Sequence, residues 1–407
     1  MRIEERVLVA LLSDYIHGSR GKYVSAVVPE NMHLTEENWR ELQRLAYIHG
    51  VGGMLYLALK ESRLGIPREA GRFRRDFDFA VMHAVKQELE MTALEEAFRE
   101  AGIRHIFFKG WEIRNYYPVP EVRMMSDVDF LIQKEDTQRA CKALEDAGFV
   151  QEQAGVDVLC YDKNALHLEM HRQIRAVFDN GSDCTAWFAD AFSHGIFKEN
   201  DCRGYFSPEY HFVFLLFHLA KHINSMGAGV RMFLDIAVFW KHFADEMDLK
   251  EVWRMLDELN LRVFTESVFW LCGEWFHVEI PGGSMPEKEL YEQLTEYVFQ
   301  GGIYGKHKRT IAGLYSRGSV TEDNIGKTGR QKRESLVRYF FPTRKQMEGV
   351  LPAVRKYPVL LPAAWMLRWC RGLFLRRKHS VKVLKEIRQG SPEAEKEYRM
   401  LKKLGLK

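Results

Sequence analysis

The stretches FFKG at 107–110 and DVDFLI at 127–132 decide the local fold of this chain. Apolar neighbours of Asp127 and Asp129 predict a buried strand over 128–132, and side chains two residues apart on a strand point to the same side. Burying two carboxylates together is costly unless a cation lies between them. The stretch therefore predicts a site for a hard divalent cation such as Mg²⁺. The alternative is a surface strand with solvated acids.

Basic and glycine residues lie just before these acids and suit a phosphate ligand. Lys109 supplies a point charge, Arg123 supplies a planar fork, and Gly110 lets backbone N–H groups approach an anion at the start of a helix predicted over 111–117. Together with a bound cation they predict metal-assisted transfer from a nucleoside triphosphate. Alternatively, Lys109 only neutralises the two aspartates.

A third acid follows in HLEMH at 167–171, within a strand predicted over 166–170. On a strand His167, Glu169 and His171 share one face. Glu169 would then be the third carboxylate that two-metal phosphoryl chemistry requires. A zinc site built from the two histidines and a pair of hydrogen-bonded histidines at a strand edge are the alternatives.

The chain around these motifs is mostly helical. A capping Thr35, apolar residues at helical spacing and helix-ending glycines set the boundaries. Strands are predicted over 103–108, 128–132 and 166–170. Helices are predicted over 36–49, 54–60, 77–101, 111–117, 135–147, 210–224, 230–247, 249–259, 263–276, 381–388 and 393–404. The glycine-rich, charged segment 301–335 is predicted to be a loop or linker. The fold class is therefore α+β, with a small mixed sheet in a mostly helical chain.

Length and cysteine usage limit the class of protein. A chain of 407 residues predicts two or three domains. The six cysteines are scattered without a CxxC pair, which excludes a zinc ribbon and favours a reducing, cytoplasmic setting. We find neither a signal peptide nor an apolar run of about 18 residues, so we expect no transmembrane segment.

Charge is unevenly distributed along the chain. Residues 303–407 carry 26 Lys+Arg and 8 Asp+Glu, a net +18, whereas the remainder carries a net −15. The basic region predicts a surface for an anionic partner such as nucleic acid or lipid headgroups, or for the acidic remainder of the same chain. Within it, Trp and Arg residues at 359–378 are consistent with a core-facing helix, a membrane interface or nucleic-acid stacking.

The signature motifs resemble those of the uncharacterised nucleotidyltransferase family, within the DNA polymerase β-like nucleotidyltransferase superfamily. The resemblance covers most of 35–245. It rests on KG at 109–110, YYP at 116–118, Arg123, DVDFLI at 127–132, AGI at 101–103, LEMH at 168–171, HLAKH at 218–222, GVR at 229–231, DI at 235–236 and LAYIHGV at 45–51. The chain departs from the superfamily in one place, because its usual Gly-Ser or Gly-Gly pair is replaced by Lys109-Gly110-Trp111.

The resemblance implies a mixed sheet flanked by helices and transfer of a nucleoside monophosphate to a hydroxyl or similar acceptor, with pyrophosphate leaving. It implies Mg²⁺, with Mn²⁺ as the alternative, and a nucleoside triphosphate that we expect to be ATP. Asp127, Asp129 and Glu169 would be the catalytic, metal-binding carboxylates. The residues expected at the nucleotide are Lys109, Gly110, Arg123, His171, Lys221, His222 and Arg231. Alternatively, the helical members of this set serve packing, with Arg231 and Asp235 as an i,i+4 ion pair.

Four regions are predicted: a helical region at 1–75, the nucleotidyltransferase domain at 76–205, a helical domain closing the site at 206–300, and a basic, mostly helical region at 301–407. The sequence leaves the acceptor open among small molecules, peptides, proteins and RNA ends. A rival hypothesis is a non-catalytic nucleotide-sensing module whose basic region binds nucleic acid or an acidic partner. A peripheral membrane protein is a third.

Overall fold

The chain forms two compact units. The computed structural model describes residues 1–66, 71–178, 181–225, 227–302, 328–347, 350–374, 380–381, 383–385, 387 and 392–407. One unit comprises Met1–Gly305 with Leu406, and the other comprises Lys306–Gly405 with Lys407. The boundary lies close to the one predicted at 300/301, whereas the finer division of the first 300 residues stays a prediction.

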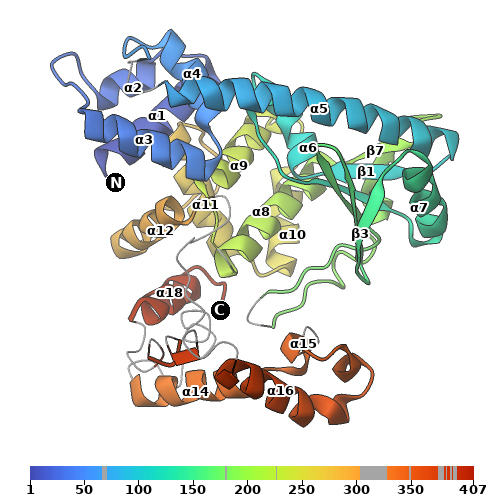
Figure 1. Ribbon diagram of the computed structural model, residues 1–407. Helices are drawn as coiled ribbons and strands as arrows, with labels where there is room; N and C mark the ends of the chain where they lie inside the picture. Colours follow the sequence, from blue (N-terminus) through green and yellow to red (C-terminus); the bar gives the residue numbers. More distant parts are fainter. Residues whose placement is uncertain are drawn as a thin grey trace. The chain divides into compact units, whose positions relative to one another are not determined.

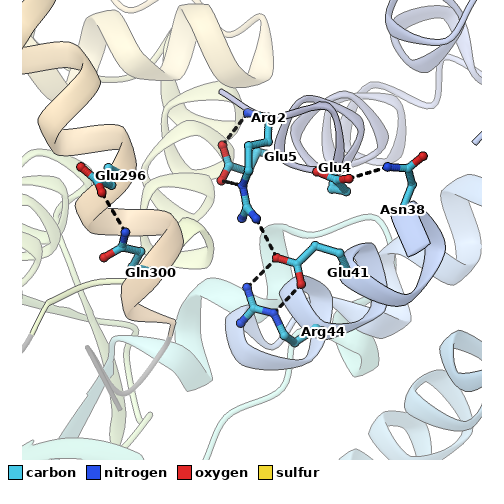
Figure 2. A network of polar contacts seen from close by, with 8 residues as sticks. All are labelled: Arg2, Glu4, Glu5, Asn38, Glu41, Arg44, Glu296 and Gln300. Carbon is cyan, nitrogen blue, oxygen red and sulfur yellow. Dashed lines mark hydrogen bonds and ion pairs between the residues drawn. The ribbon is translucent and has the colours of Figure 1, made fainter. Parts of the chain in front are cut away.

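Four helices precede the sheet: α1 (Ile3–His17), α2 (Lys22–Val27), α3 (Glu36–His49) and α4 (Gly52–Glu61). Thr35 caps α3 as predicted, in a reciprocal pair with Asn38. Polar contacts join α1 to α3 (Figure 2): Arg2 bridges Glu5 at 2.8 Å and Glu41 at 3.1 Å, and Glu41 also binds Arg44 at 2.6 Å. These contacts hold the first turn of α1 against α3.

Helix α5 (Arg72–Glu100) extends from these helices to the sheet within the first unit (Figure 1). It begins five residues before the predicted start at 77, because Phe73, between charged residues of the first turn, is buried in the fold. Its second half contributes Met91, Leu94 and Phe98 to the core beneath the sheet. It also contacts α4 and α7 (Thr137–Asp146).

The sheet is mixed and seven-stranded, with the order β3-β4-β5-β2-β1-β7-β6. Its strands are β1 (His105–Phe108), β2 (Val128–Ile132), β3 (Val150–Ala154), β4 (Val158–Lys163), β5 (Leu166–His171), β6 (Gly195–Phe197) and β7 (Arg203–Phe206). β2 pairs antiparallel with β1 and parallel with β5. The three predicted strands thus lie side by side at the centre, and the α+β class is confirmed.

Four strands, β3, β4, β6 and β7, were not predicted. β6 and β7 are short, and β3 and β4 carry polar residues, so the apolar pattern of each is weak until it pairs with its neighbours. The helix predicted over 111–117 is also shorter than expected. α6 covers Gly110–Ile113, and a 3₁₀ turn follows over Arg114–Tyr116. A single helical turn has only a small dipole, so an anion site at its start stays a prediction.

Alternation along the strands gives the sheet an apolar face and a polar face. The apolar face packs on α5 and α7 through Phe107, Phe130, Leu168 and Met170, among others. Phe108, on the opposite face, contacts Phe214 of α8 (Pro208–Asn224), with ring centroids 5.2 Å apart. Helix α8 therefore covers the face that carries the acids.

The remaining helices of the first unit are α9 (Val230–Phe243), α10 (Leu249–Glu258), α11 (Arg262–Phe276) and α12 (Lys288–Gly301). The predicted helices over 210–224, 249–259 and 263–276 agree with α8, α10 and α11. α9 ends at Phe243, four residues before the predicted end. None of the described helices is both long and apolar enough to cross a membrane.

The second unit contains α14 (Thr328–Phe340), α15 (Arg344–Met347), α16 (Leu361–Phe374) and α18 (Pro392–Lys403). The linker prediction is wrong over 328–335, which forms the start of α14, because Leu336 and Tyr339 on this helix pack against Val383 and Ile387. Residues 303–327 of the predicted linker lie outside the described residues, as does part of the helix predicted over 381–388. The terminal helix predicted over 393–404 agrees with α18.

The tryptophans of α16 pack within the second unit. Trp365 Nε1 donates to the Pro342 carbonyl at 2.9 Å, and Trp369 Nε1 donates to the Phe340 carbonyl at 2.8 Å. The Phe341 ring meets both indoles edge-on. Of the three interpretations of this stretch, these contacts favour the core-facing helix.

One buried ion pair ties the segment before β2 to α9. The Arg123 guanidinium donates from Nε to Asp235 Oδ1 at 3.1 Å and from Nη2 to Oδ2 at 2.7 Å. Tyr117 Oη donates to the same carboxylate at 2.7 Å. Arg123 and Asp235 are both buried. The helical spacing favoured an i,i+4 ion pair of Asp235 with Arg231. The Asp235 carboxylate instead accepts hydrogen bonds from Arg123 and Tyr117.

We expect Asp235→Ala to lower the free energy of unfolding by about 3–5 kcal/mol, because it leaves the Arg123 guanidinium buried without its carboxylate. Urea unfolding would measure the change. Arg40→Ala is the control, since its pair with Glu36 is exposed and is worth at most about 1 kcal/mol. A loss in Asp235→Ala no larger than in this control would contradict the assignment.

Candidate active site

Asp129 lies at the centre of the polar face. Its side chain is 2 % exposed, and its strand β2 lies between β1 and β5. The register places Asp129 opposite Phe108 on β1 and opposite Glu169 on β5. A parallel pairing in this register puts the two carboxylates on the same face, side by side.

Two basic side chains contact Asp129. Lys109 Nζ donates to Asp129 Oδ1, and His171 Nε2 is 2.8 Å from the same oxygen. Burial alone would raise the pKa of Asp129, but the Lys109 ammonium and the His171 contact outweigh burial and hold it well below its usual range. Asp129 is therefore ionised, and its charge is compensated by its neighbours.

Glu169 and His171 complete the group. His171 Nε2 lies 3.6 Å from Glu169 Oε2. One ligand atom each from Asp129, Glu169 and His171 lies within 4.8 Å of the others. Glu169 is half-buried and so is reachable from solvent. The structure therefore brings together two of the three predicted carboxylates with a histidine that could bind the same cation.

Asp127 immediately precedes β2, and its carboxylate has fewer polar contacts than that of Asp129. Its Oδ1 accepts from Ser126 Oγ at 2.8 Å. Its charge contributes to the raised pKa of both Lys109 and Arg123, so it lies close to these two cations. Among the described residues, Asp127 is not part of the group of ligand atoms within 4.8 Å. It faces the site from the end of the strand.

Lys109 has an unusual backbone conformation. Its φ of 56° and ψ of −133° join the end of β1 to the single turn of α6. Positive φ is uncommon for a residue with a Cβ and costs about 1–3 kcal/mol, so it persists only where surrounding contacts require it. Here the conformation directs the ammonium to Asp129, which is a feature that sequence spacing does not reveal.

Gly110 makes room for Arg123. A Cβ atom at position 110 would lie 2.7 Å from Arg123 Nη1 and 3.4 Å from the Met125 Cβ. The absence of a side chain therefore allows the guanidinium to lie over the start of α6. Arg123 reaches the site with Nε and Nη2 held by Asp235 and with Nη1 beside Gly110.

Helix α8 brings three further predicted or considered residues to the site. The rings of His218 and His222 are 4.5 Å apart. Burial, with Lys109 and Lys221 nearby, lowers the pKa of His222 to about 4. Burial lowers the pKa of His218 well below its usual value, with contributions from His222 and Lys109. Both imidazoles are therefore neutral in the folded protein.

Lys221 lies beside the same charges. Burial and then Lys109 and Arg175 lower its pKa, whereas Glu169 and Asp129 oppose this shift. Its Nζ is 3.4 Å from the Arg175 carbonyl oxygen. Arg175 was not predicted at the site, although two arginines, Arg172 and Arg175, closely follow HLEMH in the sequence.

Arg231, in the first turn of α9, contacts the segment that precedes β2. Its Nη1 donates to the Met124 carbonyl at 2.7 Å. The contact places the start of α9 against the backbone that leads from Arg123 to Asp127. A role at the nucleotide for Arg231, as for Lys221 and His222, stays a prediction.

The lowered pKa values of His218 and His222, which are half-buried on α8, predict how stability depends on pH. An unfolded histidine takes up a proton near pH 6.5, whereas folded His222 does so near pH 4. The unfolded state thus binds more protons in this window, so stability falls as pH drops from about 6.5 to about 4. We expect urea unfolding to show this fall and His222→Gln to reduce its slope.

His33→Gln provides the control, because His33 is exposed between α2 and α3. It should leave the dependence of unfolding free energy on pH unchanged. An identical slope in wild type and His222→Gln would contradict a neutral, half-buried His222.

Comparison with known proteins agrees with this arrangement. The family model described as "uncharacterised nucleotidyltransferase" matches residues 35–277, which is more than half of the chain and includes the whole sheet with α8 and α9. Neither the curated proteins nor the solved structures give a match. With the Asp129–Glu169 pair at the centre of the matched region, the chain belongs to this nucleotidyltransferase family.

Proposed function

We propose that the protein transfers a nucleoside monophosphate from a nucleoside triphosphate, ATP in the first instance, to an acceptor hydroxyl and releases pyrophosphate. Family membership supports nucleotidyl transfer in general. The observation that supports the metal-dependent form is the register of β2 with β5, which sets Asp129 beside Glu169 on the face covered by α8. EC class 2.7.7 and a cytoplasmic location are part of the same proposal.

The donor set fits Mg²⁺ or Mn²⁺. Both ions prefer carboxylate oxygens, and Asp129 and Glu169 offer these within 4.8 Å of each other, with Asp127 next along the chain. His171 Nδ1 is buried and has no hydrogen-bond partner among the described residues, so this side of the group has unused polar capacity. We assign Asp127, Asp129 and Glu169 as the metal ligands.

When bound, the cation supplies charge neutralisation to the triphosphate and alignment of the acceptor oxygen. The chain's own residues do the rest. Lys109 and Lys221 face the acids from β1 and α8, and their ammonium groups would bind phosphate oxygens. Arg123 Nη1, beside Gly110, is the guanidinium nitrogen that Asp235 leaves over for the same purpose.

Side chains from α8, β5 and α9 border this charged set. His222 is uncharged and can donate or accept a hydrogen bond to the nucleotide without adding to the positive charge. His171 holds Asp129 in place, and Arg231 supports the backbone before Asp127. We therefore place His171, His222 and Arg231 around the nucleotide, with Lys109, Lys221 and Arg123 on its phosphates.

We expect Asp129→Ala and Asp127→Ala to reduce nucleotide transfer by at least about 10²- to 10³-fold, because each removes a proposed ligand of the cation that would neutralise the phosphate charge. The assay supplies each labelled nucleoside triphosphate with Mg²⁺ and a cell extract as the source of acceptors. Labelled product and released pyrophosphate are measured together.

Asp146→Ala is the matched control, since Asp146 is an exposed acid of α7, on the other side of the sheet. It should retain full transfer, and circular dichroism should show that all variants are folded. Transfer that persists in the Asp127→Ala/Asp129→Ala double variant would refute the assignment. Nucleotide binding by calorimetry without transfer to any acceptor would support the nucleotide-sensing module.

The basic region favours a second property, which is binding of nucleic acid. Its net charge of +18 over 303–407 is the supporting observation. We expect the full chain to bind a single-stranded RNA oligonucleotide, with log K falling linearly with log salt as counterions are released. Fluorescence anisotropy between about 50 and 200 mM salt measures the slope. A failure of the full chain to bind RNA at the lowest salt would contradict the proposal. Peptides, proteins and small molecules would then remain as the acceptor classes.

A further inference from the structure

A second group of metal-binding side chains lies next to the candidate active site. Cys160 is on β4 and His167 and Glu169 are on β5, and one ligand atom of each lies within 4.8 Å of the others. β4 and β5 are antiparallel, with Cys160 opposite Glu169 and Asp162 opposite His167. All four side chains alternate with buried apolar neighbours, so they share the polar face of the sheet.

We propose that Cys160, His167 and Glu169 form a site for a thiophilic divalent cation, with Zn²⁺ as the natural occupant. A thiolate, an imidazole and a carboxylate are the three ligand types that zinc binds in proteins, whereas Mg²⁺ does not use sulfur. Ligand atoms of a tetrahedral zinc site are about 3.3–3.8 Å apart, as bond lengths of about 2.0–2.3 Å require. Small side-chain rotations would bring the present group to that spacing.

Asp162 supplies the outer contact that zinc-binding histidines usually have. His167 Nδ1 is hydrogen-bonded to Asp162 Oδ1. This carboxylate–histidine contact fixes the tautomer of the ring and leaves Nε2 with the lone pair that binds a metal. Asp162 would thus position His167 without being a ligand itself.

The site is accessible and negatively charged. Cys160, His167 and Glu169 are each half-buried, so an ion can reach them without opening the core. Glu169 lies opposite Cys160, and Asp162 lies two residues further along β4 opposite His167. Carboxylates on this face create a potential that favours a cation.

Glu169 belongs to both groups, and this gives the second site a consequence that rests on the proposed function. A zinc ion bound by Cys160 and His167 would draw the Glu169 carboxylate toward β4 and away from Asp129. Zinc is therefore expected to inhibit Mg²⁺-dependent transfer, whereas removal of the Cys160 thiol should abolish the inhibition and leave transfer intact.

The binding test uses the full chain and Co²⁺ as the probe, because a cobalt–thiolate bond gives a charge-transfer absorption that oxygen and nitrogen ligands do not give. We expect wild type to show this absorption at one equivalent and Zn²⁺ to displace it. Cys160→Ser should abolish it, and His167→Gln should weaken it. Asp162→Asn should lower the affinity by about 10–100-fold, as for other outer partners of metal-binding histidines.

Cys370→Ser is the matched control, since Cys370 is an exposed thiol in the second unit and should not affect the absorption. Absence of the absorption in wild type, or its loss in Cys370→Ser with retention in Cys160→Ser, overturns the proposal. His167→Gln keeps the test decisive if Cys160→Ser does not fold. These readouts need no turnover, so a failure of the proposed transferase activity would leave the result on the metal site standing.

Discussion

The interaction on which the site depends is the burial of the Asp129 carboxylate between Lys109 and His171. A lone carboxylate on a central strand would be costly to desolvate. Lys109 and His171 both contact the same Asp129 oxygen, so the charge is compensated within the sheet. Lys109 makes this contact from a backbone conformation of positive φ, which is costly for a residue with a Cβ and persists only where surrounding contacts require it.

The rest of the first unit supports the contacts of Asp129 with Lys109 and His171, because its helices cover the two faces of the sheet. The apolar face rests on α5 and α7, while the acids point to the face covered by α8. Arg123 and Asp235 join the segment before β2 to α9, and this buried pair holds the backbone that leads to Asp127. The helices after the sheet thus shape the site as well as covering it.

The central strands and the long helices could be predicted from the sequence because their apolar periodicity is strong. The strand over 128–132 agrees with β2, and α8, α10 and α11 begin and end within two residues of their predicted bounds. The strands β3, β4, β6 and β7 were not predicted, because their residues form strands only by pairing with neighbouring strands. For the same reason the sequence does not predict that Cys160 lies opposite Glu169, since register is a property of two paired strands and not of either strand alone.

Pairing between distant segments also explains why Asp235 serves Arg123 and Tyr117, although Arg231 was the partner that helical spacing favoured. Spacing along one helix identifies contacts that a helix can make, but a buried carboxylate is satisfied by whichever donors the tertiary fold brings to it. The same limit applies to Glu169. Its sequence context suggested one role, yet the sheet places it between a group rich in oxygen ligands and a group that contains sulfur. Because a carboxylate has two oxygens and both groups are reachable from β5, we expect the chemistry on this face of the sheet to depend on which cation Glu169 would hold.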